Sequence, residues 1–198
     1  MRGLEIPERI GDGPIGLRLP RFEDVPGITA ACQDPEIARW TRVPSHYTER
    51  HAREFVAFSH AAAEAGGAAQ LAVVNEADQV VGSCGVANLD WDALVAEVGY
   101  WVAASDRRRG VAVTAVRLLS AWAFESLALG RLELRAAEPN VASNRVAVAA
   151  GFTLEGTLRG GAIEGHTGDP SAPRIDLNLY GLLPSDLPPP TAASLPQR

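Results

Sequence analysis

Three consecutive arginines followed by a glycine make Arg107 to Ala112 the segment of this sequence best suited to bind an anion. A strand-like run from Glu97 to Val102 leads into this segment, and an amphipathic helix follows it. The first backbone N–H groups of a helix have no partner within the helix, and the helix dipole adds positive potential at the same end. Main-chain amides and arginine side chains there could hold a phosphate group together. A phosphorylated ligand is therefore the first functional hypothesis.

Two other phosphate-binding motifs fit this segment less well. A Walker loop needs Gly-Lys-Ser or Gly-Lys-Thr after the strand, and this segment has neither. A dinucleotide-binding fold is a closer rival, because Glu138 ends the next strand, where an acid could bind a ribose. That fold needs the pattern G-x-G-x-x-G, whereas Gly110 is the one glycine of this loop. The motif therefore argues against a nucleoside triphosphatase and against a dinucleotide-dependent enzyme.

The elements around the loop predict a mixed α/β sheet that would position it. Three strand-like runs at 70–74, 79–86 and 95–102 have short connections, which favour an antiparallel meander. Apolar residues three and four positions apart then predict a helix ending near Gly130, followed by a strand at 132–136. A crossover of this length makes the strands before and after it parallel neighbours.

Further elements are predicted at both ends of this unit, and Asp34 and Thr48 are placed to cap two of the helices. These elements are a strand at 15–20, helices at 24–33, 35–41 and 48–65, a helix at 143–150, strands at 152–158 and 175–183, and a glycine-rich connection at 160–173. Together these elements predict a mostly antiparallel central sheet of about seven strands, flanked by helices, with a parallel pair in the middle.

Length and composition predict a single folded domain. The chain has 198 residues, of which 46% are hydrophobic, enough for one buried core but too few for two full domains. We place this domain at 14–183. A loosely ordered segment, 1–13, is expected before it, and a proline-rich tail, 184–198, has a composition typical of disorder.

Charge and cysteine content narrow the class of partner. The net charge of −6 argues against a nucleic-acid or anionic-membrane surface, because such surfaces need clustered positive charge. The chain shows neither an apolar run of membrane-spanning length nor a secretory signal, which favours a cytoplasmic location. The two cysteines, Cys32 and Cys84, lack the spacing of a zinc site or a disulfide scaffold, so we expect free thiols. The sequence leaves a homodimer open.

Three blocks together resemble the Gcn5-related N-acetyltransferase (GNAT) superfamily, and within it the branch that acetylates the N-termini of ribosomal proteins. The superfamily signature R/Q-x-x-G-x-G/A is similar to Arg107-Arg108-Arg109-Gly110-Val111-Ala112. The other two blocks are Glu97-Val98-Gly99-Tyr100-Trp101-Val102 and the run from Pro139-Asn140-Val141-Ala142-Ser143-Asn144-Arg145-Val146-Ala147 to Gly151-Phe152. The resemblance extends more weakly from Leu17 to Leu183. It implies a GNAT-like domain with a splayed parallel pair, which transfers acetyl from acetyl-CoA to a primary amine.

By this resemblance, coenzyme A would bind along the loop and the strand before it. The backbone amides from Arg107 to Ala112 would hold the pyrophosphate, and Gly110 would let the main chain approach it. From the residues alone, a tight turn with solvated arginines is the alternative. The pantetheine arm would add to the edge of the earlier strand at the main chain of Trp101, Val102 and Ala103, where an N–H could also stabilise an oxyanion. Two further positions match coenzyme ligands of the family, namely Asn140 and Asn144.

Direct acetyl transfer needs a neutral amine, a stabilised oxyanion and a proton for the thiolate, and the sequence offers candidates. Glu97 lies in an otherwise apolar strand, where partial burial would raise its pKa and suit a base that acts through water. Pairing with a neighbouring strand or with the arginines is the alternative role for Glu97. By resemblance, Ser143 would help to protonate the thiolate, although its position also suits an N-cap. Many superfamily members carry a tyrosine where this chain has Ala147, which leaves Ser143 or a water as the donor.

Nothing in the chain names the amine, although three loops are candidates for its groove. His46 and Tyr47 follow Trp40 in a loop that often lines the acceptor pocket in the resembling family, and a surface turn is the alternative. Asp90, in the turn at 90–92, could attract a cationic amine or simply be solvated, as could the acids of the 160–173 connection. A protein N-terminus is slightly favoured over a small-molecule amine such as an antibiotic.

Two alternatives of other kinds bear on the chemistry. A non-catalytic acyl-CoA-binding module is the second function to consider, because Ala147 replaces the usual tyrosine. A metal site is not expected, because His51 and Glu54 share a helix face without a third convergent ligand.

Overall fold

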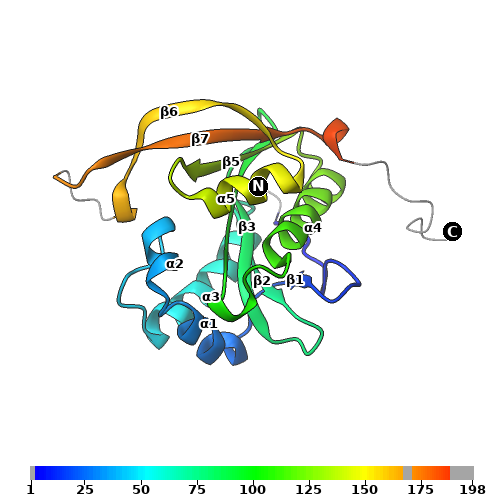
Figure 1. The fold of residues 1–198 in the computed structure, drawn as a ribbon. Helices are drawn as coiled ribbons and strands as arrows, with labels where there is room; N and C mark the ends of the chain where they lie inside the picture. The colour runs from blue at the N-terminus through cyan, green and yellow to red at the C-terminus, as the bar shows by residue number, and fades with distance from the viewer. Residues whose placement is uncertain (1–2, 167–170, 188–198) are drawn as a thin grey trace, which may run out of the picture.

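A seven-stranded sheet organises the chain in the computed structural model, which describes residues 3–166 and 171–187 (Figure 1). In chain order its strands are β1 (Gly16–Arg18), β2 (Ala69–Val74), β3 (Val80–Asp90), β4 (Val95–Val102), β5 (Arg131–Ala137), β6 (Thr153–Ile163) and β7 (Arg174–Leu182). The order across the sheet is β1-β2-β3-β4-β5-β7-β6. Neighbouring strands are antiparallel except β4 and β5, which are parallel. The predicted mixed sheet with a central parallel pair is confirmed.

The helices begin where local sequence supplies a cap. The side chain of Asp34 accepts a hydrogen bond from the N–H of Glu36, and that of Thr48 accepts one from His51 N–H. The α-helices are α1 (Val25–Ala31), α2 (Pro35–Trp40), α3 (Glu49–Glu64), α4 (Val111–Ser126) and α5 (Val141–Ala150). Short 3-10 turns are η1 (Phe22–Asp24), η2 (Ala104–Asp106), η3 (Glu164–His166) and η4 (Pro184–Asp186).

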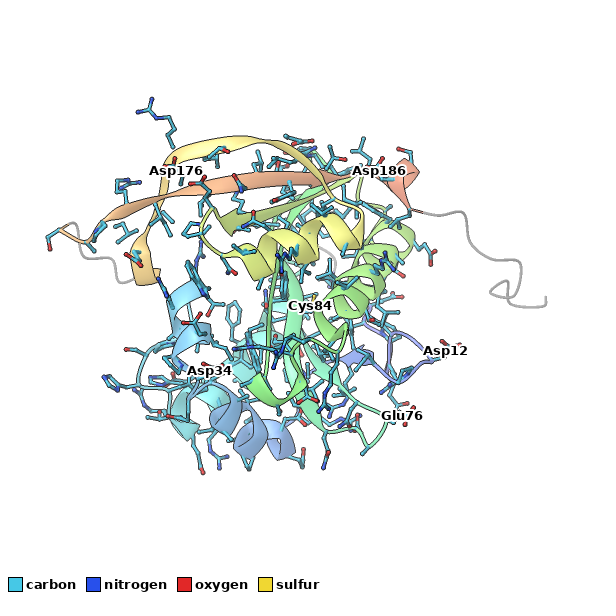
Figure 2. The ribbon with its side chains drawn as sticks, in the orientation of Figure 1. Asp12, Asp34, Glu76, Cys84, Asp176 and Asp186 are labelled. Atoms are coloured by element: carbon cyan, nitrogen blue, oxygen red, sulfur yellow. The ribbon has the colours of Figure 1, made fainter. Side chains whose placement is uncertain are left out.

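Helices cover both faces of the sheet, and each face has its own apolar core. The larger core joins α4 and α5 to side chains of the central strands, including the fully buried Leu119, Leu134 and Leu182. Cys84 is also part of this core, as a buried free thiol (Figure 2). The smaller core joins α1 and α3 on the opposite face and includes Val56.

The pairing between β4 and β5 ends halfway along β4, as the resemblance implied. Their pairing extends from Val95 opposite Arg131 only to Val98 opposite Leu134. Beyond that point β4 pairs with β3 alone, and β5 pairs with β7 alone. The edge of β4 that faces β5 is therefore open after Val98, with backbone groups that the sheet does not use.

Three features at the ends of the domain differ from the expectation. The segment at 3–13 packs on the domain: Leu4 N–H donates to Ala63 O at 2.8 Å, and Ile10 pairs with Leu17. β6 continues to Ile163, because two register shifts against β7 absorb extra residues of the glycine-rich run. The expected tail begins with the η4 turn, and its remainder, 188–198, lies outside the described residues. In the described part of the chain, none of the helices has the length and hydropathy needed to span a lipid bilayer.

Candidate active site

Two left-handed residues shape the loop between β4 and α4. Arg108 has φ 60° and Gly110, the N-cap of α4, has φ 78°. A side chain at Gly110 would be strained by this backbone, and a Cβ built there would meet no atom within 4 Å. The first-turn N–H groups that follow, at Val111 and Ala112, have no partner inside the helix. The loop therefore forms an open concave set of amides, a geometry that suits a phosphate.

The three arginines of this loop have different surroundings. The Nε of Arg107 donates to Val102 O at 3.1 Å, and its Nη2 forms an ion pair with Asp34, the N-cap of α2 (Figure 2). Arg108 and Arg109 are exposed, and Arg109 lies 3.6 Å from the carboxylate of Asp106. The Arg107 guanidinium thus braces the loop against α2, while the other two guanidinium groups face solvent.

The open edge of β4 offers backbone groups at alternate residues. Ala103 N–H donates to Val81 O at 2.9 Å, so by alternation the main chain of Trp101 and Ala103 bonds to β3. The main-chain groups of Tyr100 and Val102 point toward the gap instead, where Val102 O accepts from the Nε of Arg107. Of the three residues expected to contact the pantetheine, Trp101 and Ala103 direct their main chain to β3 and Val102 directs its main chain to the gap, because a strand directs successive amides to opposite sides.

Two asparagines stabilise the turn from β5 into α5 through different hydrogen bonds. The Oδ1 of Asn140 accepts from Ser143 N–H at 3.1 Å, and its Nδ2 makes no hydrogen bond within the described residues. The Nδ2 of Asn144 donates to Asn140 O at 2.7 Å and to Ala137 O at 2.9 Å. Its Oδ1 accepts from Asn178 and from the Tyr180 hydroxyl, both at 2.8 Å. The amide of Asn144 is thus used within the protein, whereas Asn140 keeps a free donor.

Ser143 meets a tyrosine that sequence reasoning missed. The Oγ of Ser143 lies 2.8 Å from the Oη of Tyr100, across the gap between α5 and β4. Burial raises the pKa of Tyr100 to about 12, and the hydrogen bond to Ser143 partly offsets that rise. Ala147, where related chains carry a tyrosine, is fully buried. The missed signal was the alternation in β4, which puts Tyr100 on the same face as Val98 and Val102.

Glu97 lies on the opposite face of β4, with a basic neighbour. Its Oε2 accepts from Asn88 Nδ2 at 3.2 Å and lies 3.8 Å from Arg135 Nη1. The side chain is 27% exposed, so water reaches the carboxylate. Arg135 belongs to β5 and extends the same face, together with Glu133. The structure thus contains the pairing that was the alternative role, and it leaves the carboxylate accessible to a substrate.

Of the four residues expected around the acceptor, Trp40 and His46 are accessible and the other two are used structurally. Trp40 is half-buried at the end of α2, under the guanidinium of Arg39 at 4.5 Å, and His46 is exposed. Tyr47 is 8% exposed in the smaller core, and burial raises its pKa well above the ordinary value. Asp90 caps the β3–β4 turn, where its carboxylate accepts from two backbone N–H groups. That turn lies at the far end of β4 from the gap.

α2 contacts two loops that lie far apart in the chain. The ion pair between Asp34 and Arg107 joins its first residues to the loop between β4 and α4. At its other end, Arg39 lies 3.5 Å from Glu164 in η3, which follows β6 (Figure 1). A Cβ built on Gly99, between Glu97 and Trp101, would meet nothing within 4 Å, so the surface of β4 is open at this residue.

Among residues 3–166 and 171–187, no three His, Cys, Asp or Glu side chains gather in a way that could hold a metal ion. The arrangement instead offers amides for an anion, an open strand edge for an extended ligand, and hydroxyl and carboxylate groups on opposite faces of β4.

Comparisons with known proteins agree with this geometry. The family model described as acetyltransferase (GNAT) domain matches residues 15–153. The protein named "Uncharacterized N-acetyltransferase p20" of Bacillus licheniformis is 28% identical over 144 residues, which are 72% of this chain and 81% of that protein. The structure of RimL, described as a ribosomal L7/L12 alpha-N-protein acetyltransferase in complex with coenzyme A, matches with a TM-score of 0.78 at 20% identity over 89% of this chain and 98% of that one. Mycobacterium smegmatis RimJ in complex with CoA-disulfide matches with a TM-score of 0.78 at 21% identity over 88% and 84%.

Proposed function

The chain belongs to the GNAT acetyltransferase family, and we propose on that basis that it transfers acetyl from acetyl-CoA to the N-terminal α-amine of a protein. The observation that carries this proposal is the open edge of β4 after Val98, which leads directly to the amides at the start of α4. A pantetheine arm needs a free strand edge, and a pyrophosphate needs a set of converging N–H groups. In this chain the free strand edge of β4 is followed by the N–H groups at the start of α4.

Acetyl-CoA is the cosubstrate in this proposal, and the residues fit its parts. The amides of Arg107, Arg108, Arg109, Gly110, Val111 and Ala112 would hold the pyrophosphate. Hydrogen bonds to a charged group contribute about 1.5–3 kcal/mol each, so a few suffice for tight binding. The free Nδ2 of Asn140 would add a donor, and Tyr100 and Val102 would pair with the pantetheine. Asn144 would act indirectly, because its amide holds the turn that carries Asn140.

The chemistry proposed is direct attack of the amine on the thioester carbonyl. A backbone N–H of the open β4 edge would stabilise the oxyanion. Glu97 would accept the proton of the amine through water, on the face where Gly99 leaves room for the acceptor. Ser143 would face the departing sulfur from the other side, because α5 covers the opposite face of the sheet. The products are an amide and free coenzyme A.

The charge of the acceptor face supports a peptide over a polycationic small molecule. Glu97 is paired with Arg135, and Glu164 is paired with Arg39, so these carboxylates do not form an unbalanced negative surface. Asp90 serves a turn, and Asp169 lies outside the described residues. RimL, which shares this fold, is named for acetylation of a protein α-amine. A face whose carboxylates are paired with arginines suits an extended chain end with one amine. The cytoplasmic location and the homodimer stay predictions.

An acetylation screen with thiol release as the readout tests this proposal. We expect turnover with short peptides that carry a free α-amine, and none with the same peptides blocked at the N-terminus but containing lysine. Aminoglycosides and polyamines form the comparison group. Turnover confined to that group would contradict the peptide proposal. Binding of acetyl-CoA without transfer to any amine would instead support a non-catalytic binding module.

A further inference from the structure

We infer that Tyr100 is a positioning residue for the leaving thiolate, acting through the hydroxyl of Ser143. The inference rests on the proposed function and adds a residue to it. The two hydroxyl oxygens lie 2.8 Å apart, a normal distance for a hydrogen bond between hydroxyl groups. They come from β4 and from α5, the helix that follows β5. Both hydroxyl groups therefore lie beside the gap between β4 and β5, where the thioester would lie.

The hydroxyl of Ser143 is oriented unlike those of Ser59 in α3 and Ser120 in α4. Ser59 donates to Phe55 O at 2.7 Å and Ser120 donates to Val116 O at 2.8 Å, each to the carbonyl four residues earlier. Such bonds within the helix use up the serine proton. Ser143 bonds to the Tyr100 phenol instead. When the phenol donates, the proton of Ser143 is free to point at a ligand.

Either hydroxyl can donate in this pair, and the Tyr100 hydroxyl also lies 3.4 Å from Ser143 O, so both acceptors of its proton belong to Ser143. Its side chain is half-buried between β4 and α5, with Cys84 and Tyr180 as its titratable neighbours besides Ser143. All three neighbours are neutral at ordinary pH, and burial raises the pKa of the phenol to about 12. The phenol therefore keeps its proton throughout the physiological range. A chain of two hydroxyls polarises its terminal O–H, which strengthens the hydrogen bond that Ser143 can offer.

The role of this pair is to stabilise negative charge on sulfur. When the C–S bond breaks, its electron pair stays on the sulfur of coenzyme A. A thiolate is a much weaker base than a serine alkoxide, since thiols ionise near pH 8.5, so Ser143 donates a hydrogen bond and keeps its proton. The amine gives its proton to water beside Glu97, and the thiolate takes one from solvent. Protons and charges therefore balance without a further reactant.

The pKa of the thiol of bound coenzyme A tests this role without any acceptor. The thiolate absorbs in the ultraviolet, so its formation can be followed in a pH titration of the enzyme–coenzyme A complex. We expect Ser143→Ala to raise this thiol pKa by about one unit, the size expected for loss of one charge-assisted hydrogen bond. Tyr100→Phe should raise it by less, because the hydroxyl of Ser143 remains and only its polarisation is lost. The double variant should match Ser143→Ala, because Tyr100 acts only through that hydroxyl. Tyr180→Phe is the matched control, since it loses an equivalent 2.8 Å bond to α5 and should leave the thiol pKa unchanged.

Steady-state kinetics supply the second readout. Tyr100→Phe should lower kcat, though by less than Ser143→Ala does, and leave KM for acetyl-CoA within about twofold, because the bond matters only once charge develops. Unchanged thiol pKa and kcat in Tyr100→Phe, or additive effects in the double variant, would overturn the inference. A shifted thiol pKa without acetyl transfer would contradict the proposed function alone. Should Tyr100→Phe fail to fold, Ser143→Ala tests the same pair from the surface, and a wild-type thiol pKa there would overturn the inference.

Discussion

Single residues in this site are shared between structure and chemistry. Asn144 looks like a coenzyme ligand in the sequence, yet all of its amide hydrogen-bonding capacity goes to β5, β7 and the start of α5. Asn140, four residues earlier, caps α5 with its oxygen and keeps its nitrogen free. Arg107 belongs to the loop between β4 and α4, but its guanidinium pairs with Asp34 and donates to Val102 O. Residue type alone does not separate these roles, because each depends on which partner lies within reach.

Glu97 can be tested at this same scale. Glu97→Gln keeps the shape and the hydrogen bond to Asn88 but removes the negative charge. We expect kcat to fall about 100-fold or more, the usual contribution of a general base, with the Kd of acetyl-CoA unchanged. Stopped-flow turnover and calorimetric titration measure the two quantities. Glu133→Gln is the control, because Glu133 lies opposite Glu97 on β5 and also pairs with Arg135. Equal losses in both variants would point to the charge of the face rather than to a base.

At the scale of elements, α2 connects the loop between β4 and α4 with η3. Its N-cap, Asp34, pairs with Arg107, and Arg39 in its last turn pairs with Glu164 in η3 beyond β6. A helix of this length depends on its neighbours and its cap for stability.

Asp34→Asn separates the cap from the ion pair. Asparagine caps helices as well as aspartate does, so α2 should persist while the attraction to Arg107 is lost. We expect the Kd of acetyl-CoA to rise by up to about fivefold, because a partly exposed ion pair contributes up to about 1 kcal/mol. Calorimetry measures this change, and thermal unfolding monitors the fold. Asp34→Ala is the comparison and should also lower the melting temperature. An unchanged Kd in both variants would show that the loop needs no brace.

At the scale of the whole molecule, a buried ion pair joins elements at the β1 edge of the sheet. Arg18 in β1 binds Asp24 through two hydrogen bonds of 2.8 and 3.0 Å, with side chains only 3% and 8% exposed. Asp78, in the β2–β3 turn, adds an exposed partner to the same guanidinium at 2.8 Å. The pair thus joins β1, the start of α1 and the β2–β3 turn. Loss of Asp24 would leave Arg18 buried with one exposed partner.

We expect Asp24→Ala to lower the free energy of unfolding by about 3–5 kcal/mol, the range for breaking a buried pair. Asp78→Asn should cost at most about 1 kcal/mol, because its carboxylate is 47% exposed and solvent screens it. The hydrogen bond from Arg18 lowers the pKa of Asp78 below its ordinary value. Its contribution is therefore present above that ordinary value and is lost as the pH falls through the lowered pKa. Denaturant unfolding across pH checks both, and equal losses in the two variants would contradict the assignment.

The order and type of the elements follow from sequence patterns that act over short distances. Helix caps at Asp34 and Thr48 and the apolar spacing after Gly110 predict where the helices lie. The length of the crossover predicts that the strands before and after the long helix are parallel neighbours. The end of β6 was the main error, because glycines suggest a loop, while pairing with β7 and two bulges keep the chain extended. The packed segment at 3–13 was missed for a similar reason, since its partners lie on α3 and β1.

The sequence by itself determined the family and predicted a phosphate loop at Arg107 to Ala112 and a base at Glu97, because these depend on residue type and local spacing. Tertiary structure alone decided that Tyr100 meets Ser143, that Arg107 pairs with Asp34, and which amides of β4 remain open. Those contacts join elements that lie far apart in the chain. A periodic pattern tells which face a side chain occupies, but only packing determines which group it meets there.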